Sequence, residues 1–183
     1  MTHFMLDLET LGTGPDAAVV AIGACAFDPC KTGVDAEKFY LRVTLTDAMR
    51  YGQVDASTVK WWMAQSDAAR NATFQGDASP LAWSLERFNV WLDRLCESKA
   101  KTEACVWGNG ATFDNVVIRS AFKAIEIEPI WSFRNDKCYR TVVNLVPQDR
   151  RPPFVNVGTA HNALDDAVAQ ACYLQACHRA LGL

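Results

Sequence analysis

Hydrophobic and polar positions along the chain change period, and this change separates predicted strands from predicted helices. Apolar stretches at about 4–8, 19–28 and 38–43 are separated by the turn-forming segments GTGPD and DPCKTG, and they indicate three strands. Connections this short favour antiparallel neighbours. A further apolar stretch at 104–109 predicts a fourth strand.

Helical periodicity occurs in the remaining stretches, at about 56–69, 80–97, 112–125, 139–146 and 161–181. Three strands followed by alternating strand and helix are typical of an α/β fold, with a mixed central sheet whose first three strands are antiparallel and which helices flank. No repeat, low-complexity tract or long linker interrupts the 183 residues, so we expect one domain over residues 1–183.

The first predicted strand carries two acids, Asp7 and Glu9, in an otherwise apolar stretch. Side chains alternate along a strand, so these two carboxylates share one face, about 7 Å apart. Like charges at this distance repel unless a cation lies between them or water screens them. Two interpretations remain at this point: a cation site, or the wet face of a half-buried edge strand.

A third acid, Asp114, occupies the first turn of the helix predicted at 112–125. On a helical wheel it lies within the apolar stripe of this helix, which consists of Val117, Ile118, Ala121, Phe122 and Ile125. A buried carboxylate is normally paired, protonated or bound to a metal. The alternative is an acid that accepts hydrogen bonds from backbone N–H groups at the helix N-terminus.

The last predicted helix opens with His161, and Asp165 and Asp166 follow. The two acids lie opposite an apolar stripe made of Ala163, Ala167, Ala171 and Leu174. Taken alone, a histidine at a helix start is more often structural than catalytic, and acids there are ordinary partners of the helix dipole.

In combination, these residues resemble the three motifs of the DEDDh 3′–5′ exonuclease superfamily: Asp7-x-Glu9, then Phe113-Asp114, then His161-Asn162-Ala163-x-x-Asp166. The chain is further similar to a bacterial and phage branch described as exonuclease VIII-like or 3′–5′ exoribonuclease. That similarity covers LETLGTGPDAAVVAIGACAFDP, STVKWWMAQSDAAR, VWGNGATFDNVVIRSAF and CYRTVVNL, which is most of the chain. One departure is Gly110, where many members have Asn.

The resemblance implies a ribonuclease H-like fold and a site with two Mg²⁺ or Mn²⁺ ions. Asp7 is then the bridging ligand, Glu9 and Asp166 bind the ion that holds the attacking water, and Asp114 binds the other ion. The family spacing selects Asp166 over Asp165, with His161 in the loop before the helix. His161 is the implied general base. The implied product is a nucleoside 5′-monophosphate from the 3′ end of single-stranded RNA or DNA, with RNA slightly favoured.

Substrate contacts are expected from two sources. By resemblance, Leu11 wedges against the last base, with Thr10 nearby. On a helical wheel Val59, Trp62 and Met63 form a core-like stripe, whereas Trp61 shares a face with Gln65, so Trp61 is the expected base-stacking residue. The basic cluster of Arg134, Lys137, Arg140, Arg150 and Arg151 is interpreted mostly as solvated surface, within reach of phosphates.

Composition bears on the binding partners and on the cellular compartment of the protein. The formal net charge of −3 is unusual for a nucleic-acid binder, but metal ions on four of the 21 acids would bring the balance close to neutral. Seven cysteines without a Cys-x-x-Cys pair indicate reduced thiols, and no apolar run is long enough to span a bilayer, so we expect a cytoplasmic protein without a membrane partner. Relatives are often homodimers. The competing functions are a catalytically silent nucleic-acid-binding domain and an internal-cutting ribonuclease H-like nuclease.

Overall fold

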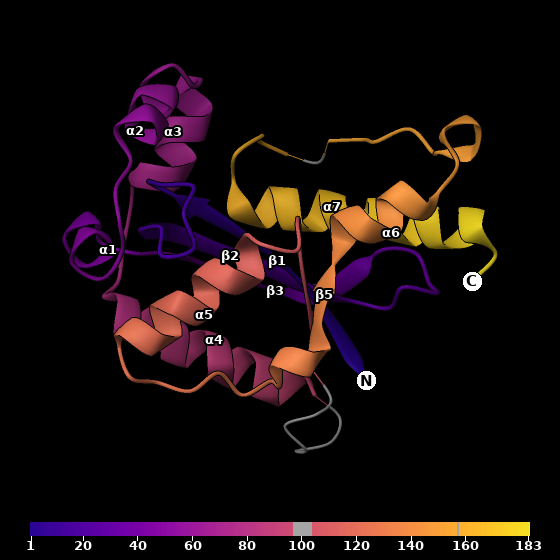
Figure 1. Cartoon of the computed structure of the whole chain (residues 1–183), viewed down its shortest axis with the longest axis horizontal. Helices are drawn as coiled ribbons and strands as arrows, with labels where there is room; N and C mark the ends of the chain where they lie inside the picture. Colours follow the sequence, from indigo (N-terminus) through magenta and orange to yellow (C-terminus); the bar gives the residue numbers. More distant parts are fainter. Residues whose placement is uncertain (97–103, 157) are drawn as a thin grey trace.

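A computed structural model describes residues 1–96, 104–156 and 158–183, and a five-stranded mixed sheet runs through it (Figure 1). The strand order is β3-β2-β1-β4-β5. β1 pairs antiparallel with β2 and β2 with β3, whereas β4 lies parallel to β1 and β5 parallel to β4. The prediction of a mixed sheet with three antiparallel first strands is confirmed. The bounds are β1 Thr2–Thr10, β2 Val19–Phe27, β3 Val34–Arg42, β4 Ala104–Gly108 and β5 Asp136–Cys138.

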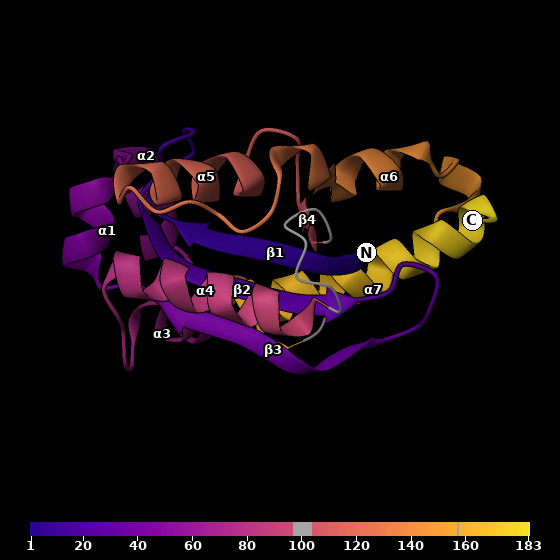
Figure 2. The same cartoon turned by 90° about the horizontal axis from the view of Figure 1, so that it is seen from below.

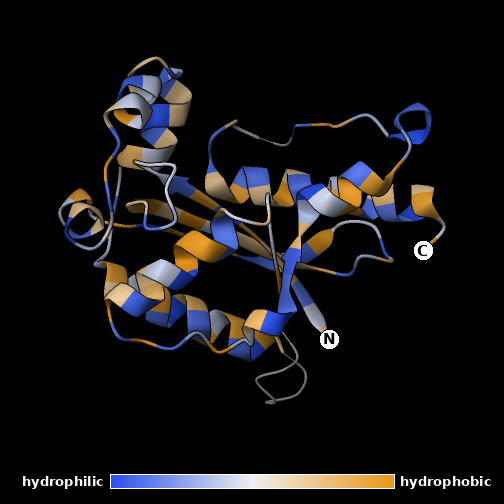
Figure 3. Ribbon diagram, viewed as in Figure 1, coloured by the Kyte–Doolittle hydropathy of each residue, from blue (hydrophilic) through white to orange (hydrophobic). Residues whose placement is uncertain are grey.

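Helices cover both faces of the sheet, with α4 and α5 on one face and α6 and α7 on the other (Figures 1 and 2). Figure 3 shows hydrophobic and hydrophilic residues interleaved along these helices, as expected when only one side of a helix packs on a sheet. None of the helices in the described ranges is long and apolar enough to cross a membrane. The bounds are α1 Leu45–Tyr51, α2 Ala56–Met63, α3 Asp67–Phe74, α4 Leu81–Leu95, α5 Asp114–Ala124, α6 Tyr139–Leu145 and α7 Ala163–Leu181, with 3-10 turns at Phe133–Asn135 and Gln148–Arg150.

Alternation along β1 divides the core into two hydrophobic clusters. Phe4, Leu6 and Leu8 pack into the cluster that α4 and α5 cover, whereas Met5 packs with residues of α6 and α7. Burying a large apolar side chain contributes roughly 1.5–3 kcal/mol, so both faces hold β1 firmly in place. The same alternation directs Asp7 and Glu9 toward α7.

Gly23 of β2 allows the start of α7 to rest on the sheet. It is the register partner of Asp7 on β1. A Cβ at Gly23 would lie 2.1 Å from the carbonyl carbon of Ala163 and 2.2 Å from the nitrogen of Leu164, so any side chain there would push α7 away. The close approach brings the first turn of α7, with Asp166, over the middle of β1.

Several predicted boundaries differ from the structure. The helix predicted at 56–69 is two helices, because Ser66 caps α3 by accepting a hydrogen bond from the Ala69 nitrogen at 3.2 Å. The short α1 and β5 were not predicted: α1 buries only Ala48, and β5 has three residues, too few to show alternation. β3 begins four residues earlier than predicted, since the outer part of this edge strand is polar and exposed. Glu97, the predicted last residue of the helix at 80–97, lies outside the described residues.

Candidate active site

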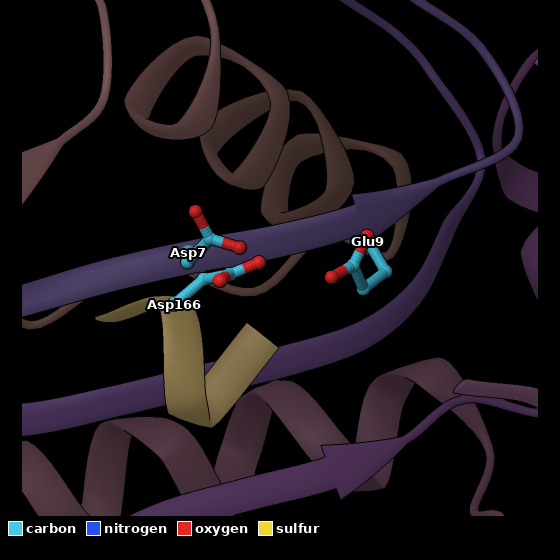
Figure 4. Close-up of side chains that lie close together, drawn as sticks. All are labelled: Asp7, Glu9 and Asp166. Carbon is cyan, nitrogen blue, oxygen red and sulfur yellow. The ribbon is translucent and has the colours of Figure 1, made fainter. Parts of the chain in front are cut away.

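Three carboxylates from opposite ends of the chain meet above β1. Asp7 and Glu9 project from β1 and Asp166 from α7, and one oxygen of each lies within 4.8 Å of the other two (Figure 4). Glu9 is buried, with 7% of its surface exposed, while Asp7 and Asp166 are partly exposed. These three acids, which the sequence predicted as metal ligands, therefore share one space.

The cluster is electrostatically unfavourable without a cation. Burial, followed by the negative charges of Asp166 and Asp114, raises the pKa of Glu9 to about 8. Burial and the charges of Asp114 and Glu9 likewise raise the pKa of Asp7 well above its usual range. Glu9 Oε1 is buried and has no hydrogen-bond partner among the described residues. Converging hard oxygen donors, one of them unpartnered, fit a divalent ion such as Mg²⁺ or Mn²⁺.

Asp114 lies beside this cluster, at the first position of α5, and is only 1% exposed. Its Oδ1 accepts a hydrogen bond from the Leu8 nitrogen at 3.2 Å, and its Oδ2 accepts one from the Asn109 nitrogen at 2.7 Å. Burial raises the pKa of Asp114 to about 6, although these two hydrogen bonds oppose the shift. Both features proposed for Asp114 thus occur together: the side chain points inward, and backbone N–H groups hold it.

His161 occupies the loop immediately before α7, as predicted. Its φ of 62° is in the left-handed region, which costs a non-glycine residue on the order of 1–3 kcal/mol. The backbone is held on both sides: its N–H donates to Asp166 Oδ2 at 2.9 Å, and its carbonyl accepts from Thr73 Oγ1 at 3.1 Å. The imidazole meets the Trp61 ring edge to face, with 4.9 Å between the centroids.

Asp165, the alternative to Asp166, has a different environment. Its Oδ2 accepts a hydrogen bond from the Thr159 nitrogen at 2.7 Å and closes the loop that carries His161. It does not belong to the three-carboxylate cluster.

A pocket of about 470 Å³ opens beside Glu9, and it is lined by Leu8, Glu9, Thr10, Gly12, Thr13, Ser57, Thr58, Trp61, Trp62 and Phe113. Trp61 is 44% exposed in this pocket, and Trp62 is buried and donates from Nε1 to the carbonyl of Thr10 at 2.9 Å. Thr10 and Trp61, two of the expected substrate contacts, thus both line this pocket.

Two expectations near the pocket differ from the structure. Leu11 is only 8% exposed, packs in the cluster under α4 and α5, and is not among the residues lining the pocket. The core-like stripe of Val59, Trp62 and Met63 is wrong, because Met63 is 74% and Val59 36% exposed. Trp62 is the single buried residue of α2, so this helix has no buried stripe that a helical wheel could identify.

Sequence reasoning missed several residues of the site. Gln170 donates from Nε2 to Asp7 Oδ1 at 2.7 Å. Its position four residues after Asp166, on the same side of α7, is a signal that could have found it. Phe113 lines the pocket just before Asp114. Thr73 carries no comparable signal, because its contact with His161 exists only in the tertiary structure.

Fold and site together define a class of protein. A mixed five-stranded sheet, acids on its first strand and at the starts of two helices, and a histidine before the last helix are the features that the motif resemblance to DEDDh 3′–5′ exonucleases implied. The family model of the 3′–5′ exoribonuclease Rv2179c-like domain matches residues 2–178. The chain belongs to this family.

Individual relatives are more distant. The chain is 26% identical over 134 residues to an exodeoxyribonuclease of Enterobacteria phage T4, a match that covers 69% of this chain and 58% of the phage protein. Among solved structures, an E. coli ExoI–ssDNA complex with bound zinc aligns with a TM-score of 0.62 at 17% identity, over 93% of this chain and 38% of ExoI. The nuclease domain of 3′hExo, a DEDDh family member bound to rAMP, aligns with a TM-score of 0.60 at 13% identity, over 99% of this chain and 92% of that domain. At these identities the two structures show a shared fold.

Proposed function

We propose that this chain is a metal-dependent 3′–5′ exonuclease that releases nucleoside 5′-monophosphates from the 3′ end of single-stranded nucleic acid, with RNA slightly favoured over DNA. The observation that carries the proposal is the convergence of Asp7, Glu9 and Asp166 beside an open pocket. Family membership supports the polarity of the reaction. Residues 1–183 act as one exonuclease domain in this proposal.

The carboxylates hold two divalent ions, Mg²⁺ or Mn²⁺. Asp7 would serve both ions, Glu9 and Asp166 would hold one of them, and Asp114 would serve the other. The free Oε1 of Glu9 and the raised pKa values of the cluster support these roles. When bound, the ions supply an acidified water and stabilise the charge on the leaving oxygen.

His161 accepts the proton of the attacking water on an unprotonated imidazole nitrogen. Its loop is suited to this task, since Asp166 and Thr73 hold its backbone and Trp61 contacts its ring. Gln170 holds the Asp7 carboxylate through one of its two oxygens.

The pocket receives the terminal nucleotide. The exposed face of Trp61 stacks on the base, a contact worth roughly 1–3 kcal/mol per base and tolerant of base identity. Phe113 and Thr10 line the same pocket. In this proposal the last phosphodiester lies at the metal site, because the pocket opens beside Glu9.

The preference for RNA rests on the family, whose description is an exoribonuclease, whereas the phage relative is an exodeoxyribonuclease. RNA and DNA strands of equal sequence, labelled at the 5′ end, decide this directly when supplied with Mg²⁺ or Mn²⁺. We expect ladders that shorten from the 3′ end, nucleoside 5′-monophosphates as products, faster hydrolysis of RNA, and no reaction in excess EDTA. An Asp166→Asn variant purified in parallel controls for contaminating nucleases.

Each competing function predicts a different product. Internal fragments at early times would identify an internal-cutting nuclease, and intact strands that nevertheless bind would identify a silent binding domain. Undiminished cleavage in EDTA would overturn the metal assignment.

The proposal places the enzyme in the cytoplasm, and the seven cysteines, which form no disulfide bond among the described residues, support a reducing compartment. The homodimer implied by related proteins stays a prediction, and sedimentation equilibrium tests it.

A further inference from the structure

A nucleic-acid strand has to approach a site rich in negative charge. Asp7, Glu9, Asp114 and Asp166 gather around the proposed scissile bond, and the formal net charge of the chain is −3. Bound ions would neutralise this negative charge at the scissile phosphate itself. The phosphates further along the strand need a cationic side chain of the protein if they are to be held.

Arg140, in the first turn of α6, is an exposed arginine tethered to the active-site loop. Its Nη2 donates to the carbonyl of Asn109 at 3.2 Å and to Asn109 Oδ1 at 3.3 Å. The N–H of the same Asn109 donates to Asp114 Oδ2 at 2.7 Å. One residue therefore links the guanidinium to a carboxylate of the site, and the positive charge of Arg140 is one of the smaller effects that oppose the rise in the pKa of Asp114.

The tether leaves part of the guanidinium available. Within the described ranges of the chain, Nε and Nη1 of Arg140 donate to no protein acceptor. On the loop side, Cζ and Nη1 lie 3.9 Å from the position that a Cβ on Gly110 would take, so the guanidinium packs beside a residue that has no side chain and whose φ of 132° favours glycine. A guanidinium anchored through one nitrogen, with two others free, is suited to bind a phosphate through charge-assisted hydrogen bonds.

The position of α6 indicates which phosphate this is. The nucleotide pocket is lined from α2 by Ser57, Thr58, Trp61 and Trp62. Figures 1 and 2 show α2 and α6 on either side of the start of α5, where Asp114 lies. With the terminal nucleotide next to α2 and its phosphate at the carboxylates, the rest of the strand continues toward α6.

We infer that Arg140 binds the backbone phosphate on the 5′ side of the scissile bond, one linkage upstream, and so selects strands of three or more nucleotides. The inference rests on the proposed function, because it takes the direction of the strand from it. It makes Arg140 a substrate-binding residue, whereas a merely structural arginine would only fasten Asn109 to α6.

Substrate length tests the assignment. A dinucleotide with a 5′-hydroxyl contains only the scissile phosphate, and a trinucleotide adds the upstream one. We expect Arg140→Gln to lower kcat/KM for the trinucleotide about tenfold, mainly by raising KM, and to leave kcat/KM for the dinucleotide unchanged. A tenfold loss corresponds to the low end of the free energy contributed by one charged hydrogen bond, as expected at an exposed position. A trinucleotide with an uncharged methylphosphonate at the upstream linkage should be hydrolysed equally by both proteins.

Salt dependence provides a second readout that does not require turnover. The affinity for a fluorescent trinucleotide, measured with Ca²⁺ as the divalent ion, should depend less steeply on salt in Arg140→Gln, by about 0.7 in the log–log slope for one phosphate contact on a single strand. Arg140→Lys keeps the charge and the slope but loses the planar fork, so its affinity should be intermediate. Arg87→Gln, an exposed arginine on α4 on the other face of the sheet, is the matched control and should behave as wild type.

The outcomes separate the two proposals. An equal loss on dinucleotide and trinucleotide, or an unchanged salt slope, overturns the upstream-phosphate assignment even if the protein is an exonuclease. If the wild-type protein hydrolyses no strand, the proposed function fails, and the binding slopes still decide whether Arg140 contacts a phosphate.

Discussion

Replacing Glu9 with glutamine should make the metal-free protein more stable at high pH while abolishing its activity. In the folded protein the pKa of Glu9 is raised from 4.5 to about 8 by burial and by the charges of Asp166 and Asp114. An acid whose pKa is raised by folding destabilises the fold only where it is ionised in the unfolded chain. The stability of the metal-free protein therefore falls as pH rises from about 4.5 to about 8, and the loss is complete above that window.

The size of this loss follows from the two pKa values. Their separation, from 4.5 to about 8, corresponds to on the order of 5 kcal/mol for a fully ionised Glu9. Native domains are stable by about 5–15 kcal/mol in total, so the penalty is a large share. For a chain of this size it corresponds to a melting temperature lower by about 10–20 °C. Glutamine has similar volume and no charge, and so avoids the penalty.

The assay is urea unfolding of both proteins in EDTA at pH 5, 7 and 9, followed by circular dichroism. We expect the two free energies of unfolding to agree within about 1 kcal/mol at pH 5 and to differ by several kcal/mol at pH 9, with Glu9→Gln the more stable. Adding Mg²⁺ or Mn²⁺ at pH 9 should stabilise the wild type more than the variant. Glu86→Gln, an exposed acid on α4, should follow the wild type at every pH. If the free energies of unfolding of wild type and Glu9→Gln changed in parallel from pH 5 to pH 9, the reasoning would be refuted.

Other substitutions test the remaining parts of the site. Asp166→Asn should remove most activity, whereas Asp165→Asn should be mild because an amide oxygen still accepts from the Thr159 nitrogen; a reversed order in kcat would show that the wrong acid was assigned. His161→Ala should lower kcat roughly 10²–10⁴-fold with Mn²⁺ affinity by calorimetry nearly unchanged, and lost Mn²⁺ binding would contradict its role as base. Thr73→Val should lower kcat by about tenfold at constant KM, since it removes the hydrogen bond to the His161 carbonyl, while Thr73→Ser should retain wild-type activity. Gly23→Ala should keep the strands but displace α7, so that circular dichroism stays native while Mn²⁺ binding is lost; retained binding would show that the helix adjusts.

The features that the sequence predicted correctly depend on regular periodicity. Alternation along β1 placed Asp7 and Glu9 on one face, and that strand keeps its register with β2 as far as Glu9. The family spacing selected Asp166, which the structure brings into one cluster with Asp7 and Glu9, and the loop position of His161 is confirmed. These inferences needed only short-range geometry and the resemblance of the motifs.

The features that the sequence did not predict depend on contacts between distant segments. The register shifts between Glu9 and Thr10, and the nitrogen of Leu11 bonds to the carbonyl of Ala18 at 2.9 Å, so alternation no longer tells where Leu11 points. The break between α2 and α3 depends on a single cap at Ser66. The support of His161 by Thr73 joins residues 88 positions apart, and no local pattern reports such a contact.

The close packing of α7 on Gly23 also determines at which stage of folding the acids of the site are brought together. Before α7 docks, β1 carries only Asp7 and Glu9, without Asp166, without His161, and without Gln170, whose bond to Asp7 spans 163 residues. Under the proposed function, we therefore expect ion binding only once the fold is complete. In a refolding experiment, we expect Mn²⁺ binding to appear with the last kinetic phase, after the sheet has formed, so that the ion acts as an internal reporter of the docking of the C-terminal helix.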